Sequence, residues 1–395
     1  MSVRNGREFL SIPGPTTVPD EVLSAMHRPA VDIYNGSDLE QVTDGLLRDL
    51  QRVIRTRGRT YIYPANGHGA WEAAATNLFS RGDKVLVLES GRFAVGWGEM
   101  AAMIGVEVEV LNGKPRGAVD PAMVEDRLRE DAIHEIKAVL VVQIDTASGV
   151  VNDIPAIRAA IDAAGHPAML MVDTIASLGI MPYEMDAWRV DVTVAAAQKG
   201  LMTPPGLSFI AANERALEAH HTAGLRTSYW DWTQREGPLH YQKYCGTPPE
   251  HLLFGLRKAL DMLFAEGLEN VFERHRLIAE AVRRAVDVWS EGGALSFNIT
   301  EPAERSDSVT LVLTEGFDPA TLLTYCREKC GVVLGIGIGE FTDRAFRIAH
   351  MGHINAPMIL GTLSTVEVGL GALGISHGRG GVQAAIDWLS ESVRP

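Results

Sequence analysis

Short apolar runs alternate with amphipathic stretches from about residue 37 to residue 295. Runs rich in valine, isoleucine and leucine that end in turn residues predict buried strands, whereas apolar residues at helical spacing predict helices. The expected strands are Thr60–Pro64, Lys84–Leu88, Glu107–Val110, Ala138–Gln143, Ala168–Val172, Val190–Ala196 and Leu207–Ala211. The expected helices between them include Ala70–Phe79, Met123–Arg129 and Asp153–Ala164. This alternation predicts an α/β unit whose mostly parallel sheet is covered by helices on both faces.

The two ends of the chain follow different patterns. Pro13-Gly14-Pro15 favours an extended arm over residues 1–20, followed by a helix near residues 21–26. A long amphipathic helical stretch from Pro249 to about Glu291 leads into further strands and helices, expected at Ser308–Leu313, Gly331–Leu334, Ala345–Ala349, Pro319–Lys329 and Ala356–Leu373. We therefore predict an arm (1–20), a large domain (21–260) and a small C-terminal α+β domain (261–395).

Two of the predicted strands lead directly into charged residues. Asp173 follows Ala168–Val172, and Lys199 follows the run that ends at Ala197. A lysine at the end of a buried strand is costly unless it is paired, neutral or covalently linked. Pyridoxal phosphate requires such a lysine for a Schiff base with its aldehyde, and an acid that keeps its pyridine nitrogen protonated. The pair predicts a pyridoxal phosphate site in which Lys199 and Asp173 are catalytic. For Lys199 alone, the alternative is a strand end that meets water.

The segment Asn66-Gly67-His68-Gly69 follows a predicted strand and opens a helix. Asn66 is a good N-cap, and glycines allow an anion to approach the helix N-terminus, which favours negative charge. The segment therefore predicts a phosphate site, with a simple helix cap as the alternative. Trp71, on the same helix, is interpreted as a core residue.

Two further turns carry candidate cofactor contacts. Phe93 follows the strand Lys84–Leu88 and is placed to stack on a planar ring; the alternative is a core aromatic. Thr146 lies in Asp145-Thr146-Ala147-Ser148-Gly149, where its hydroxyl is placed to reach the cofactor's ring oxygen. The alternative is a turn stabilised by side-chain-to-backbone bonds.

Tyr244 and Thr247 lie at the start of the long helical stretch. Their hydroxyls are candidate phosphate ligands that reach over from a second subunit, or they belong to a capped helix start. Arg347 lies within an apolar strand, where its guanidinium needs a carboxylate, either that of a substrate or that of an internal salt bridge. His350 and His353 lack a third ligand, so we expect no metal site.

The composition narrows the class of protein. The chain has 395 residues and a net charge of −14, which suits two domains and argues against nucleic-acid binding. No apolar run reaches the length of a membrane span, and residues 1–7 lack a signal-peptide pattern. The three cysteines, Cys245, Cys326 and Cys330, form neither a disulfide framework nor a usual zinc pattern. A cytoplasmic protein is the expectation.

Together these motifs resemble one family. They are Pro13-Gly14-Pro15-Thr16, Gly67-His68, Trp71-Glu72-Ala73-Ala74, Asp145–Val150, Val172-Asp173, Gln198-Lys199-Gly200, Pro204-Pro205-Gly206, and Phe346-Arg347-Ile348 with Gly352. The chain resembles class V pyridoxal-phosphate aminotransferases of the alanine/serine–glyoxylate type, from Pro13 to about Leu373. The resemblance implies the fold type I of pyridoxal-phosphate transferases and a homodimer whose active sites lie at the subunit interface.

The resemblance also implies a role for each candidate residue. Lys199 holds the coenzyme and then moves a proton between it and the substrate α-carbon, while Asp173 pairs with the pyridine nitrogen. The other implied contacts are Phe93 and Ile175 on the ring faces, Thr146 on the ring oxygen, and Asn66, Gly67, His68, Gln198 and the partner subunit's Tyr244 and the partner subunit's Thr247 on the phosphate. Arg347 is implied to bind the substrate carboxylate, and Tyr34 borders the substrate pocket.

The implied reaction moves the amino group of serine or alanine to glyoxylate or pyruvate. Residues 32–35 are Asp-Ile-Tyr-Asn, where serine–glyoxylate members tend to have Asp-His-Arg, and Tyr229–Trp232 adds aromatic residues near the expected entrance. Both features resemble pyridoxamine–pyruvate aminotransferase, so that reaction and the ureidoglycine–glyoxylate reaction are alternatives. The phosphate-site residues Asn66, His68 and Tyr244 favour a tightly bound coenzyme.

Three other classes of protein fit the sequence less well. A cysteine desulfurase or lyase shares this fold but needs a reactive cysteine on a mobile loop and usually a histidine on the ring, where this chain has Phe93. A pyridoxal-binding regulator would need a fused DNA-binding module, and no spare sequence for one is visible. A purely structural protein gives no reason to place Asp173 and Lys199 together.

Overall fold

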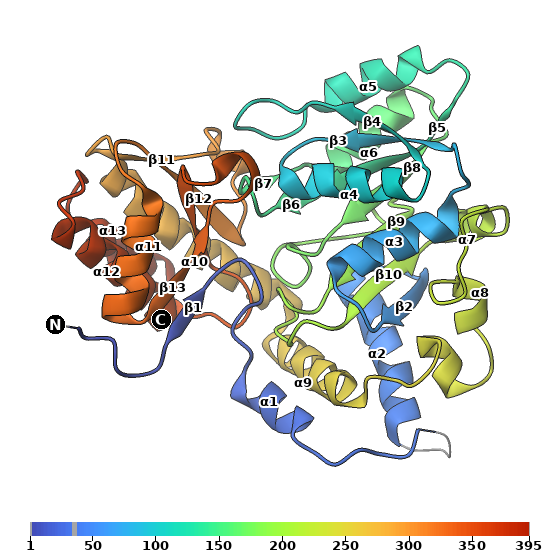
Figure 1. The fold of residues 1–395 in the computed structure, drawn as a ribbon, viewed down its shortest axis with the longest axis horizontal. Coiled ribbons are helices and arrows are strands. Elements are labelled where there is room, and N and C mark those ends of the chain that lie inside the picture. The colour runs from blue at the N-terminus through green and yellow to red at the C-terminus, as the bar shows by residue number, and fades with distance from the viewer. Residues whose placement is uncertain (1, 34–37, 395) are drawn as a thin grey trace.

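The computed structural model describes residues 2–33 and 38–394, and its largest element is a seven-stranded sheet (Figure 1). The strand order is β2-β10-β9-β8-β5-β3-β4. The bounds are β2 Arg59–Tyr63, β3 Lys84–Leu88, β4 Glu107–Leu111, β5 Ile136–Val142, β8 Met169–Asp173, β9 Val192–Ala196 and β10 Ser208–Ala212. All neighbours run parallel except β10, which is antiparallel to both β2 and β9. The predicted mostly parallel sheet is confirmed.

The strands of this sheet are buried on both faces, which explains their continuous apolar runs. Side chains of β5 alternate between two separate cores, with Val139 and Val141 in one and Leu140 and Val142 in the other. The first core is closed by α2 Asp38–Ile54, α5 Pro121–Glu130, α6 Ile154–Ala163 and α9 Glu250–Glu266. The second is closed by α3 Gly67–Leu78, α4 Arg92–Met103, α7 Glu214–His220 and α8 Trp232–Arg235.

A second sheet of five strands has the order β1-β13-β14-β12-β11. Its strands are β1 Phe9–Ser11, β11 Leu295–Phe297, β12 Val309–Thr314, β13 Val332–Ile336 and β14 Ala345–Ala349. The helices that pack on it are α10 Leu268–Ser290, α11 Pro319–Tyr325, α12 Ala356–Ala372 and α13 Gly381–Ser392. This is the expected α+β arrangement, and Figure 1 shows it beside the larger sheet.

The remaining elements are short. They are α1 Asp20–Met26, the hairpin of β6 Ile144–Asp145 and β7 Val150–Val151, and the helical turns His240–Tyr244, Pro302–Glu304, Cys326–Cys330 and Gly339–Phe341.

Two segments differ from their sequence-based expectation. The predicted arm contains a strand, because residues Phe9–Ser11 pair in parallel with Val332–Leu334 of β13. The long helical stretch is two helices, because Gly267 adopts φ 87° between α9 and α10, a left-handed conformation that favours glycine. The domain boundaries at residues 20 and 260 stay predictions.

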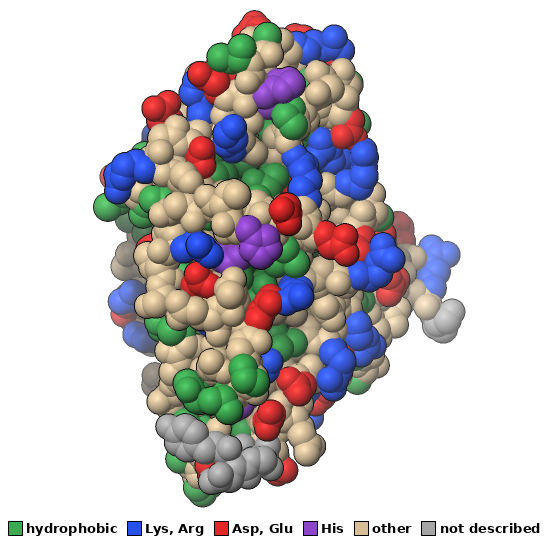
Figure 2. All heavy atoms as spheres, turned by 90° about the vertical axis from the view of Figure 1, so that its right-hand side faces the viewer, with side chains coloured by type: hydrophobic (Ala, Val, Ile, Leu, Met, Phe, Trp, Pro, Cys, Tyr) green, Lys and Arg blue, Asp and Glu red, His purple; other side chains and the backbone are tan. Residues whose placement is uncertain are grey.

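Acidic and basic side chains are interspersed on the face shown in Figure 2, and no patch of a single charge covers it. Within residues 2–33 and 38–394, every helix is too short or too polar to cross a lipid bilayer.

The helix α12 offers a matched test of the core that packs on the five-stranded sheet. Val366 is fully buried and Val368, two residues along, is 54% exposed. We expect Val366→Ala to lower the free energy of unfolding by about 2 kcal/mol, because it removes buried methyl groups and leaves a cavity. Val368→Ala should change it by less than about 0.5 kcal/mol. Urea unfolding followed by circular dichroism measures both, and equal losses would contradict this packing.

Candidate active site

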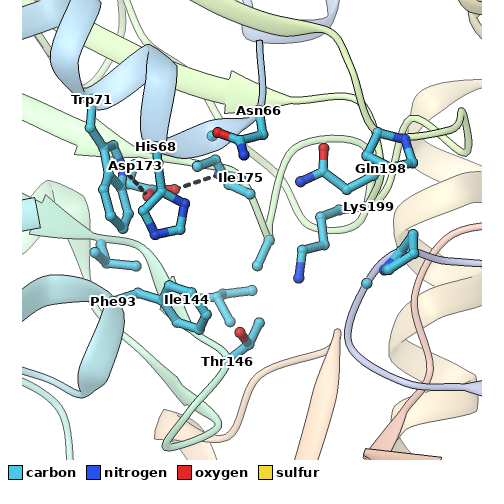
Figure 3. Close-up of a pocket in the computed structure, with 16 residues that line it drawn as sticks. Asn66, His68, Trp71, Phe93, Ile144, Thr146, Asp173, Ile175, Gln198 and Lys199 are labelled. Carbon is cyan, nitrogen blue, oxygen red and sulfur yellow. Dashed lines mark hydrogen bonds between the residues drawn. The ribbon is translucent and has the colours of Figure 1, made fainter. Parts of the chain in front are cut away.

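A cavity of about 280 Å³ lies at the carboxyl ends of β5, β8 and β9 (Figure 3). In a parallel sheet these ends meet at one edge, where α/β proteins bind their ligands. The lining consists of Gly14, Pro15, Asn66, Gly67, His68, Trp71, Phe93, Val142, Ile144, Thr146, Asp173, Ile175, Ala176, Gln198, Lys199 and Pro205. Nine of these are predicted site residues, namely Asn66, Gly67, His68, Phe93, Thr146, Asp173, Ile175, Gln198 and Lys199.

Asp173 is the last residue of β8 and is only 3% exposed. One carboxylate oxygen, Oδ1, accepts the backbone N–H of Ile175 at 2.7 Å, and Oδ2 accepts the indole N–H of Trp71 at 2.7 Å. Burial raises the pKa of Asp173 to about 7, and these two hydrogen bonds oppose the rise. The Asp173 carboxylate therefore has a fixed orientation, and in its ionised form it can pair with a positively charged group.

Lys199 follows β9 and is also buried. Its Nζ donates to the backbone carbonyl of Pro13, and a Cβ added at Gly14 would lie 2.6 Å from Nζ. Thr16 Oγ1 donates to the backbone carbonyl of Lys199 at 3.0 Å, so the N-terminal segment covers this side of the cavity. Burial and then the charge of Arg347 lower the pKa of Lys199 to about 8. Because this pKa lies below that of a free lysine, more of the amine is in the neutral form, which acts as nucleophile and base.

Another wall of the cavity is the start of α3. Asn66 caps this helix by accepting the N–H of Gly69 at 3.2 Å. The N–H groups of a first helical turn have no intrahelical acceptors, so Gly67 and His68 offer them to a ligand. A Cβ at Gly67 would lie too close to Ile175 Cδ1, so a side chain there would force the end of Ile175 to shift within the cavity wall. Gln198 Oε1 is buried and has no hydrogen-bond partner among the described residues.

Arg347 lies on β14 of the second sheet and is 7% exposed. Its Nε donates to the carbonyl of Ile336 at 2.7 Å, and Nη1 donates to the carbonyl of Thr146 at 3.0 Å, at the edge of the cavity. Burial lowers its pKa to about 10. In the part of the chain that the structure describes, no carboxylate lies within ion-pair distance of Arg347, so the internal salt bridge is not observed.

Two predicted site residues lie elsewhere. The hydroxyl of Tyr244 is buried against Thr43 Oγ1 at 2.8 Å, and Thr247 is exposed; neither lines the cavity of its own chain. Their predicted role concerns the cavity of a second subunit and stays a prediction. Tyr34 falls outside the described residues.

Sequence reasoning missed several lining residues, of which Trp71 matters most because it touches Asp173. The sequence does give one indication that Trp71 lines the cavity. Trp71 lies four residues after Gly67 and therefore on the same face of the helix. Gly14 and Pro15 were expected only in an extended arm, and the pairing of β1 with β13 brings them to Lys199.

Comparison with known proteins agrees with this geometry. Residues 9–340 match the family model for aminotransferase class-V. The chain is 40% identical to a serine–glyoxylate aminotransferase of Methylorubrum extorquens, over 98% of each chain. It is 38% identical to an L-aspartate–glyoxylate aminotransferase of Paracoccus denitrificans, over 95% of this chain and 94% of that one.

A solved structure with the same fold is pyridoxamine–pyruvate aminotransferase from Mesorhizobium loti, with a TM-score of 0.90 and 28% identity over 100% of both chains. The expected fold type I of pyridoxal-phosphate transferases is thereby confirmed. The family match covers the larger sheet, every residue that lines the cavity, and the second sheet apart from β14, and the chain belongs to the class-V aminotransferases.

Proposed function

We propose that this aminotransferase uses pyridoxal phosphate to move the amino group of serine or alanine to glyoxylate or pyruvate. The observation that carries the proposal is the meeting of Lys199, Asp173 and the start of α3 in one cavity, with Arg347 at its edge. These groups come from four separate places in the chain, and their chemistry is complementary to a single ligand.

The cavity fits pyridoxal phosphate in its distribution of charge. Asp173 suits a protonated pyridine nitrogen, and the N–H groups at the start of α3 suit a phosphate (Figure 3). Gln198 supports the phosphate end, because its amide NH₂ is a hydrogen-bond donor on the cavity side (Figure 3). Phe93 offers a flat aromatic face and Ile175 an aliphatic surface to a ring in the same space.

When bound, the coenzyme supplies an aldehyde that takes up the amino group and a ring that accepts the electron pair of a broken C–H bond. Lys199 Nζ would hold the coenzyme in the resting enzyme and would be the base that takes the proton from the substrate's α-carbon. Asp173 keeps the ring protonated. Arg347 binds the substrate's carboxylate through its planar fork and so orients the bond to be broken.

We infer the amino acceptor from the names of the relatives and the amino donor from the charges of the residues that line the cavity. Both curated relatives are named for glyoxylate, which is therefore the acceptor we propose first. Burial, and then the charge of Arg92, lower the pKa of His68, so this lining residue favours its neutral form, and Lys199 is taken up by the coenzyme. A donor such as aspartate would need a further cation for its second carboxylate. The lining supports a donor with a short, uncharged side chain.

The pyridoxamine–pyruvate reaction is the second candidate, because the solved enzyme of that name shares the whole fold. The phosphate donors at the start of α3 favour a retained coenzyme instead. A cysteine desulfurase is disfavoured because none of the three cysteines lines the cavity, and Cys326 is buried in the core of the five-stranded sheet.

A spectral half-reaction tests the function. Coenzyme-loaded protein is mixed separately with L-serine, L-alanine, L-aspartate, ureidoglycine and pyridoxamine, while the visible absorbance of the coenzyme is recorded. We expect L-serine or L-alanine to bleach the band and glyoxylate to restore it, because the amino group passes to the coenzyme and then to the acceptor. Lys199→Ala should lack the band. Colour that no amino acid changes would refute the proposal, and bleaching by pyridoxamine alone would establish the second candidate.

The role of Arg347 is tested by Arg347→Lys. Lysine keeps the charge but loses the bidentate fork, so kcat/KM for the amino donor should fall about a hundredfold. Coenzyme absorbance should remain, because Arg347 is not a cofactor contact. The matched control is Arg283→Lys, a similarly buried arginine that bonds to the carbonyls of Arg305 and Ser306 away from the cavity. An unchanged kcat/KM in Arg347→Lys would contradict the assignment.

A further inference from the structure

The indole of Trp71 makes a hydrogen bond that the proposed function does not use. Its Nε1–H donates to Asp173 Oδ2 at 2.7 Å, and the ring is 1% exposed. The other carboxylate oxygen is engaged by the backbone N–H of Ile175. One donor is therefore fixed by the main chain of the turn after β8, whereas the other depends on a single side chain from α3.

Asp173 lies where an ionised carboxylate is costly. A buried carboxyl favours its neutral form, whereas a hydrogen bond donated to the carboxylate favours the charged form. Burial raises the pKa of Asp173 to about 7, and the charge of Asp145 adds to the rise. The bonds from Ile175 and Trp71 and the charge of Lys199 lower this pKa. Near neutral pH, the loss of one donor therefore changes how much of the acid is charged.

Trp71 also touches other parts of the cavity wall. Its ring centroid lies 4.5 Å from that of His68 and 6.5 Å from that of Phe93, and it stacks on Trp97 at 6.0 Å. His68 belongs to the anion-binding start of α3 and Phe93 to the first turn of α4. Figure 3 shows the indole standing beside Asp173 and His68 on the same side of the cavity.

We propose that Trp71 is a positioning residue that keeps Asp173 ionised and oriented toward a protonated pyridine nitrogen in the cavity. This inference rests on the proposed function. Trp71 acts through Asp173 rather than on the substrate, and it makes the strength of coenzyme binding depend on pH through that carboxyl group.

Trp97 provides a matched control. It is as buried as Trp71 and stacks on it with an interplanar angle of 12°, but its Nε1 has no hydrogen-bond partner in the described structure. Trp71→Phe and Trp97→Phe therefore make the same change in ring size in one aromatic cluster. Only the first removes a donor from Asp173.

The experiment is equilibrium dialysis of the apoprotein of each variant against pyridoxal phosphate at several pH values. At pH 7 we expect Trp71→Phe to raise the dissociation constant about tenfold or more, because a hydrogen bond to a buried charge is lost. Trp97→Phe should stay within about twofold of the native protein. Loss of the Trp71 donor raises the pKa of Asp173. Binding should therefore weaken at a higher pH than in the native protein during acidification, and the gap should narrow at alkaline pH.

The outcomes separate this inference from the proposed function. If the native protein fails to bind pyridoxal phosphate, the proposed function fails. If it binds and Trp71→Phe and Trp97→Phe behave alike at every pH, the positioning role of Trp71 alone is overturned. A tenfold loss in Trp71→Phe that does not vary with pH also overturns it, because a loss of packing does not follow the ionisation of Asp173.

A measurement on the native chain covers the case in which Trp71→Phe does not fold. The seven tryptophans give indole N–H signals in nuclear magnetic resonance spectra. We expect one of these signals in the apoprotein to move with a midpoint near pH 7 and to stop moving in Asp173→Asn. A spectrum without such a signal would overturn the inference.

Discussion

The candidate site depends on the burial of an acid and an amine at the ends of adjacent strands. Asp173 ends β8 and Lys199 follows β9, and the parallel pairing of these strands brings the two residues to one edge of the sheet. The same burial acts on them in opposite directions, because it raises the pKa of the acid to about 7 and lowers that of the lysine to about 8. An acid and an amine that both titrate near neutral pH are suited to proton transfer.

The second sheet completes the cavity rather than merely adjoining it. β14 carries Arg347, whose guanidinium bonds to the carbonyl of Thr146 in the larger unit. β13 holds β1 in register, and the chain after β1 then reaches Lys199. The placement of Lys199, and in the proposed function the recognition of the substrate by Arg347, therefore both depend on how the two sheets pack.

Much of the fold and of the candidate site can be predicted from the sequence, because the patterns that indicate them involve residues close together in the chain. Buried strands are short apolar runs, and polar residues directly after them fall at the carboxyl edge, which locates Asp173, Thr146 and Lys199. Asn66 is found in the same way, as a cap. The bond from Trp71 to Asp173 joins residues 102 positions apart, and a tryptophan on a core helix face gives no sign of which acid it meets. Tyr244 shows the converse, since its sequence context suggests a ligand, while in the single chain its hydroxyl bonds to Thr43.

The contact between Lys199 and the N-terminal segment limits what side-chain mutagenesis can reveal about the site. The acceptor of the lysine amine is the main-chain carbonyl of Pro13, and Thr16 returns a bond to the main chain of Lys199. Replacing side chains one at a time leaves a carbonyl in place, so alanine scanning would pass over the Pro13 acceptor. Changing the number of residues between β1 and Gly14 would displace that carbonyl. The length of this connection therefore sets where the acceptor for Lys199 lies, and the absence of a side chain at Gly14 leaves room for the lysine.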